Sequence, residues 1–137
     1  MRISLLITLT AFTFSVIILS GCSANCNKAS ETGKSFLKNL YTCNFMVCDA
    51  LCTENGKGEV RWFASNLTED DLAIISQNVE IEAQEDEISE TSASILYMAK
   101  NVIICDSMET KSYLGERTIK VILKKDNGSW KVDKLEW

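Results

Sequence analysis

Six cysteines are the residues best able to do chemistry in this sequence, which contains no histidine. Thiols can form disulfides, bind structural zinc or catalyse redox exchange. The sulfurs that could hold zinc belong to Cys26, Cys43, Cys48 and Cys52. Cys48-x3-Cys52 has the spacing of a zinc-binding pair, but Cys26 and Cys43 do not form a second such pair, so no metal site is expected. No Cys-x-x-Cys motif is present, which leaves a disulfide as the favoured chemistry if the chain is exported.

The first residues have the organisation of an export signal. Arg2 precedes an apolar run over residues 3–18, and Leu19-Ser20-Gly21-Cys22 places small residues and a cysteine at the cleavage position. This ending resembles the lipobox of bacterial lipoproteins, whose cysteine is diacylated on sulfur and commonly acylated, for example with palmitate, on its new amino terminus. The alternative is a transmembrane anchor, because spanning begins near ~18 apolar residues. The polar Ser23-Ala24-Asn25 favours cleavage, so residues 1–21 are predicted to be a lipoprotein signal peptide.

Lipidation of Cys22 would tether the chain to a membrane and leave 137 − 21 = 116 residues, enough for one small domain. The mature formal charge would be −5 − 1 = −6, which argues against nucleic acid as a partner. Residues 22–29 are interpreted as the lipidated tether and 30–137 as a single domain outside the cytoplasm. Ser23 in place of a retaining aspartate permits the outer membrane as well as the cell membrane.

With Cys22 lipidated, 6 − 1 = 5 cysteines remain, so at least one thiol is unpaired or joins another chain. In one predicted helix Cys48 and Cys52 share a side, whereas Cys43 lies roughly 140° away from Cys48. A distant partner is therefore more plausible than a bridge within the helix. We expect Cys105 to pair with the Cys48/Cys52 side or with Cys43.

Helical periodicity dominates the first half of the mature chain. Ser30 is the expected cap of a helix that runs to Cys52, because apolar residues recur every three or four positions. Residues 53–58 contain two glycines and are interpreted as a loop, followed by a short helix over 60–64. Thr68, followed by three acidic residues, predicts the start of another short helix.

Alternating periodicity begins after Asn78. Residues 79–84 alternate apolar and polar, 92–105 form a strand with both faces covered, and 113–125 form a third strand. Residues 126–129 contain the Asn-Gly pair of a type I′ turn, which leads into a return strand. The order of helices before hairpin-linked strands predicts an α+β fold with an antiparallel sheet of three to four strands.

The residues that carry a family resemblance are the helix 34–41, the segment 64–76 and the closing hairpin 118–137. Together they resemble the nuclear-transport-factor-2-like superfamily, with cystatin-like order, in which a strongly curved sheet wraps a long first helix to form a cone. More narrowly, the chain is similar to small bacterial lipoproteins of that superfamily, some described as lumazine-binding. The cysteine-rich first helix departs from the pattern.

The resemblance implies a cone that holds a small apolar or aromatic ligand. The lining residues expected from it are Phe36, Leu40, Tyr41, Trp62, Phe63 and Tyr97. We therefore predict a non-catalytic small-ligand-binding module without a cofactor.

Two other functions stay open. Ketosteroid isomerase and scytalone dehydratase place a carboxylate and tyrosine or histidine partners inside such a cone. The corresponding candidates are Asp49, Asp106, Tyr41, Tyr97 and Tyr113, each of which also has an ordinary structural explanation. The second alternative is a cell-envelope interaction module. Its outer sheet face would pack on an envelope protein or a second copy through Leu96, Met98 and Val102.

Overall fold

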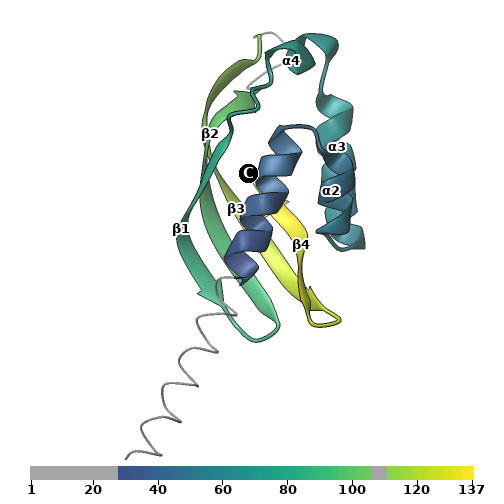
Figure 1. Ribbon diagram of the computed structural model, residues 1–137, viewed down its shortest axis with the longest axis vertical. Helices are drawn as coiled ribbons and strands as arrows, with labels where there is room; N and C mark the ends of the chain where they lie inside the picture. Colours follow the sequence, from purple (N-terminus) through teal and green to yellow (C-terminus); the bar gives the residue numbers. More distant parts are fainter. Residues whose placement is uncertain (1–27, 106–110) are drawn as a thin grey trace, which may run out of the picture.

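The computed structural model describes residues 28–105 and 111–137. Residues 28–41 are helical, and the helices that follow are α2 (Phe45–Ala50), α3 (Glu54–Asn66) and α4 (Glu69–Ile74). The strands are β1 (Glu80–Ile88), β2 (Ser92–Ile104), β3 (Tyr113–Asp126) and β4 (Ser129–Glu136). They form one antiparallel sheet in the order β1-β2-β3-β4 (Figure 1). The predicted α+β class, with helices followed by an antiparallel sheet of three to four strands, is confirmed.

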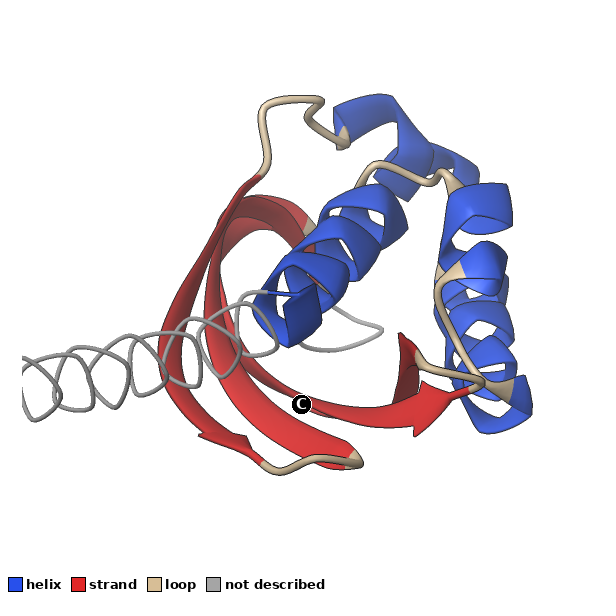
Figure 2. Cartoon of the chain, turned by 60° about the horizontal axis from the view of Figure 1, so that its bottom comes forward, coloured by secondary structure: helices blue, strands red, loops and turns tan. Residues whose placement is uncertain are grey.

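The sheet curves around the 28–41 helix, and α2 and α3 lie on the other side of that helix, next to β4 (Figures 1 and 2). Helical spacing brings Phe36, Leu37 and Leu40 onto one side, where all three are 0% exposed. Every second residue along the strands points toward the helix and forms the other side of the core. Its central members, all buried, are Ile95, Tyr97, Ala99, Ile119, Val121, Leu123, Val132 and Leu135.

The first helix differs from its prediction at both ends. Residues 28 and 29 are already helical and Ala29 is 0% exposed, so Ser30 is not the cap of this helix. The helix ends at residue 41, and Cys43 has a φ of 65°, which no right-handed helix contains. Asn44 then donates its backbone N–H to the carbonyl oxygen of Asn39 at 2.8 Å. The apolar spacing continues across this turn, which is why it predicted one helix in place of two.

The predicted loop over 53–58 is the first part of α3. The Thr53 hydroxyl accepts a hydrogen bond from the backbone N–H of Gly56 at 3.2 Å and donates one to Oδ1 of Asp133 at 2.8 Å. A Cβ on Gly56 would overlap the Val132 carbonyl oxygen and lie 2.6 Å from the Cβ of Cys52. Gly56 therefore allows α3 to approach β4 closely, although the sequence suggested a turn.

The start of α4 follows the prediction. The Thr68 hydroxyl accepts from the Asp71 N–H at 3.1 Å, and the Asp71 carboxylate accepts from the Thr68 N–H at 3.0 Å. This reciprocal pair satisfies two helix N–H groups that would otherwise lack partners. The expected hairpin turn is also present, since Asn127 and Gly128 have φ values of 51° and 81°.

Candidate functional site

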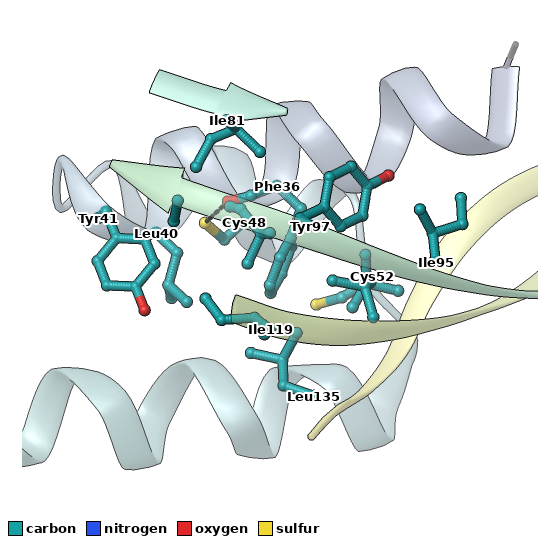
Figure 3. Close-up of a cluster of buried hydrophobic side chains, with 14 of the residues drawn as sticks. Phe36, Leu40, Tyr41, Cys48, Cys52, Ile81, Ile95, Tyr97, Ile119 and Leu135 are labelled. Carbon is teal, nitrogen blue, oxygen red and sulfur yellow. Dashed lines mark hydrogen bonds between the residues drawn. The ribbon is translucent and has the colours of Figure 1, made fainter. Parts of the chain in front are cut away.

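The structure brings five of the six predicted ligand-lining residues into the interior. Phe36, Leu40, Tyr41, Phe63 and Tyr97 are 0–8% exposed and belong to one hydrophobic core. Figure 3 shows four of them, Phe36, Leu40, Tyr41 and Tyr97, within this core. Trp62 does not join them in the core, because it lies on α3 with 57% of its surface exposed. The middle of the concave sheet face is packed against the helix, so Phe36 and Leu40 act as core residues.

Aromatic rings gather at the Tyr41 end of the helix. This aromatic cluster consists of Tyr41, Phe45, Trp62, Phe63 and Trp137. Phe63 and Trp137 are nearly parallel, with ring centroids 6.1 Å apart, and the Tyr41 ring stands edge-on to Phe63 at 5.4 Å. Trp62 and Trp137 remain 57% and 40% exposed. The aromatic cluster therefore extends from the core to the surface.

Tyr41 has a buried hydroxyl group without a hydrogen-bond partner among the described residues. The residue is 2% exposed, and burial raises the pKa of its phenol, an effect that the nearby charge of Arg117 opposes. A buried polar group left unsatisfied costs about 1–3 kcal/mol. Native proteins usually satisfy such a group with a protein partner or ordered water, so an orphaned buried hydroxyl calls for an explanation.

Arg117 contacts the same Trp137 ring as Tyr41 and was missed by the sequence analysis. It precedes the buried Ile119 and Val121 by two and four positions, so it belongs to the concave face of β3. Its guanidinium carbon lies 5.3 Å from the ring centroid of Trp137, a cation–π contact. Among the described residues no carboxylate forms an ion pair with it. Arg117 falls at an alternating position of the strand that is otherwise apolar, and this feature of the sequence could have identified it.

The four described cysteines, Cys43, Cys48, Cys52 and Cys105, are free thiols, so the expected disulfide is not formed among them. The backbone of Cys52 forms an isolated β-bridge with Val132 of β4. Val132 pairs with Leu123 of β3, and Leu123 pairs with Ala93 near the start of β2, so Cys52 lies at that end of the sheet. Cys105 follows the opposite end of β2, 105 − 93 = 12 residues away. That separation is on the order of 40 Å along the strand, far beyond the reach of a disulfide.

Burial keeps the thiols of Cys48 and Cys52 protonated. The Cys48 thiol donates to the Phe36 carbonyl oxygen at 3.5 Å (Figure 3), and burial raises its pKa to about 12. Burial likewise raises the pKa of Cys52 to about 11. Both thiols are therefore protonated at neutral pH and poorly nucleophilic.

The residues considered for acid–base chemistry are not brought together. Asp49 is exposed on α2, Tyr113 is 50% exposed, and the Tyr97 hydroxyl donates to the Ser30 carbonyl oxygen. Asp106 lies outside the described residues. Within 28–105 and 111–137, no group of three or more His, Cys, Asp or Glu side chains could hold a metal ion.

Of the three residues predicted to lie on the outer face of the sheet, one lies in the core instead. Leu96 and Met98 are half-buried, but Val102 is 1% exposed. The register shifts between Ala99 and Val102, where Asn101 has a φ of 62°, and the strand turns Val102 into the core.

The membrane-related predictions concern residues mostly outside the described part of the chain. Cys22, Cys26, the signal peptide 1–21 and the tether up to residue 27 all lie there. Across the helices that the structure describes, none is both long and apolar enough to cross a membrane.

In comparisons with known proteins, the chain matches no protein-family model and no curated protein. The aromatic cluster, the Tyr41 hydroxyl and the Arg117 guanidinium are therefore the basis on which a function can be proposed.

Proposed function

We propose that this protein is a membrane-anchored bacterial lipoprotein whose domain binds a small ring-containing ligand without catalysis. The observation that carries the proposal is the Tyr41 hydroxyl, which is buried without a partner among the described residues, beside rings that reach the surface. Binding sites for small molecules are mostly apolar, with a few polar groups that fix orientation. A ligand acceptor atom would satisfy Tyr41 while its ring covered exposed indole surface of Trp62 and Trp137.

The curved sheet around the 28–41 helix supports a cone of the nuclear-transport-factor-2-like kind. Such folds often carry a pocket on the concave side, which is an argument from analogy between folds. The aromatic cluster lies at one end of that side, because Tyr41 ends the helix and Arg117 belongs to the concave face of β3. The ligand would thus enter at the end of the cone, beyond the packed Phe36 and Leu40.

Lipidation at Cys22 would give this site a defined orientation. Residue 28 lies 28 − 22 = 6 positions after Cys22, so the intervening chain spans at most about 20 Å. The residue-28 end of the helix lies at the same end of the molecule as the β1–β2 and β3–β4 turns (Figure 1). Tyr41 is at the other end of the helix, so the proposed site would face away from the membrane.

Native mass spectrometry of the exported protein in mild detergent tests the binding proposal. We expect a reproducible added mass that leaves on denaturation and is reduced in the Trp62→Ala variant. Leu72→Ala is the matched control, since Leu72 is 52% exposed on α4 and outside the aromatic cluster. A bare mass for the wild type, together with no gain in melting temperature from any ring-containing compound tested, would contradict the proposal.

A second candidate function is an envelope interaction module. Met46 is 87% exposed and Val47 44% exposed on α2, next to Phe45 of the aromatic cluster. Exposed apolar groups of this kind are typical of protein contacts. In the same spectra, a dimer mass that Met46→Ser abolishes would favour this function over ligand binding.

A further inference from the structure

We propose that the ligand of the aromatic cluster is an aromatic carboxylate, held through its anionic group by Arg117 and Tyr41. This inference rests on the proposed binding function and adds the chemical class of the ligand. It follows from three features of the site: an unpaired cation, an unpaired hydroxyl donor and exposed aromatic surface.

The cation is the guanidinium of Arg117. It is half-buried on the concave face of β3, where its neighbours in the strand's alternation are apolar. Among the described residues the guanidinium contacts the Trp137 ring, at 5.3 Å, and no carboxylate lies within ion-pair distance. A guanidinium presents paired N–H donors that match a carboxylate, and hydrogen bonds between charged groups are about twice as strong as neutral ones.

The second donor is the Tyr41 hydroxyl. Burial raises the pKa of this phenol, so it carries its proton at neutral pH and can donate it. Tyr41 and Arg117 contact the same Trp137 ring, at 6.4 Å between ring centroids and 5.3 Å from guanidinium carbon to centroid, which places the two groups at one site. An ionised carboxylate accepts hydrogen bonds and donates none, so it would satisfy both groups at once. A cationic ligand would be repelled by Arg117.

The aromatic part of the ligand follows from the exposed rings. Trp62 and Trp137 lie with centroids 6.2 Å apart and are 57% and 40% exposed, next to the buried Phe63. A flat ring placed against them would bury apolar surface and make ring–ring contacts. A small oxyanion without a ring would leave this surface in water, which is why an aromatic acid is favoured over inorganic phosphate.

A pair of probes that differ only in charge tests the inference on the exported protein. Naphthalene-1-carboxylate and its neutral carboxamide are titrated at low salt by quenching of tryptophan fluorescence. We expect the carboxylate to bind about tenfold more tightly, as a charge-assisted contact predicts. In Arg117→Gln this preference should disappear while the carboxamide affinity is retained, and Tyr41→Phe should weaken the carboxylate more than the carboxamide.

Lys100→Gln is the matched control, because Lys100 is exposed on β2, next to the buried Ala99 and hence on the opposite sheet face. It removes the same charge and should leave the preference unchanged. Equal binding of both probes to the wild type would overturn the carboxylate class and leave the binding function standing. Absence of binding by either probe, with a bare native mass, would overturn both.

Discussion

The hydroxyl of Tyr97 donates a 2.7 Å hydrogen bond to the main-chain carbonyl oxygen of Ser30, 67 residues earlier in the chain. Tyr97 projects from the centre of β2, and Ser30 lies in the first turns of the described helix. This bond therefore joins the sheet to the helix that it surrounds. Gly33 lies against the same ring, so the helix and the sheet approach each other closely at this contact.

Tyr97→Phe removes the hydroxyl and keeps the ring. A hydrogen bond of this kind contributes about 1 kcal/mol to stability, and we expect the free energy of unfolding to fall by about that amount. Urea denaturation followed by circular dichroism measures the change. An unchanged midpoint would mean that the bond contributes nothing to joining the helix and sheet.

Gly33→Ala tests the close approach itself. A Cβ at this position would overlap the Tyr97 hydroxyl oxygen and lie 2.8 Å from its Cζ atom. Overpacking of this kind typically costs about 1–3 kcal/mol. Gly58→Ala is the matched control in another helix, because nothing lies within 4 Å of a Cβ there. We expect it to stabilise the protein by up to about 1 kcal/mol, as alanine does in helices, and similar effects of the two substitutions would contradict this interpretation.

The strands were predictable from the sequence because their faces differ in environment. Ile119, Val121 and Leu123 alternate with more exposed residues, and all three are fully buried on the concave face. The turn at Asn127-Gly128 was predictable as well, since both residues adopt positive φ. The helix break at Cys43 was not predictable, because helical apolar spacing continues through it and the break is stabilised by backbone contacts.

The candidate site was only partly predictable. The sequence identified aromatic residues of the first helix and α3 as candidates. It did not show which of these side chains would be buried in the core and which would reach the surface. Arg117 and Trp137 come together with Tyr41 through the pairing and curvature of the sheet, which depend on contacts far apart in sequence. A charged residue in an apolar alternation is the one local sign of such a site.

Thiol reactivity should follow burial. Cys105 is exposed, whereas Cys48 is 0% and Cys52 7% exposed with raised pKa values. We expect a maleimide at pH 7 to label Cys105 of the reduced native protein within minutes and to leave Cys48 and Cys52 unlabelled until urea is added. Peptide mass spectrometry identifies the labelled residues. Rapid native labelling of Cys48 would show that α2 opens readily from the core.

Lipidation should depend on one cysteine. Cells that produce the full chain in the presence of an azide-tagged palmitate should label the wild type and not the Cys22→Ser variant. Cys26→Ser is the matched control, since the same substitution four positions later leaves Leu19-Ser20-Gly21-Cys22 intact. Retained label in Cys22→Ser would refute the predicted anchor.

The buried thiols also predict a loss of stability in alkali. Burial raises the pKa of Cys48 from 9.0 to about 12, so between these values the unfolded chain releases a proton that the folded chain retains. The stabilising contribution is therefore complete below pH 9 and is lost progressively as the pH rises toward 12. Raising the pH from 7.5 to 10.5 should lower the free energy of unfolding by about 1–2 kcal/mol through this thiol.

Cys48→Ala separates this effect from other alkaline titrations. The variant leaves a small cavity and should be less stable at pH 7.5, yet its stability should fall less by pH 10.5 than that of the wild type. Cys105→Ala, at an exposed position, should follow the wild-type decline. Urea denaturation in the presence of a reductant, carried out at pH 7.5 and 10.5, measures how far the free energy of unfolding falls in each of the three proteins. Parallel declines in all three proteins would mean that Cys48 ionises equally in the folded and unfolded chains, and hence that solvent reaches it within the fold.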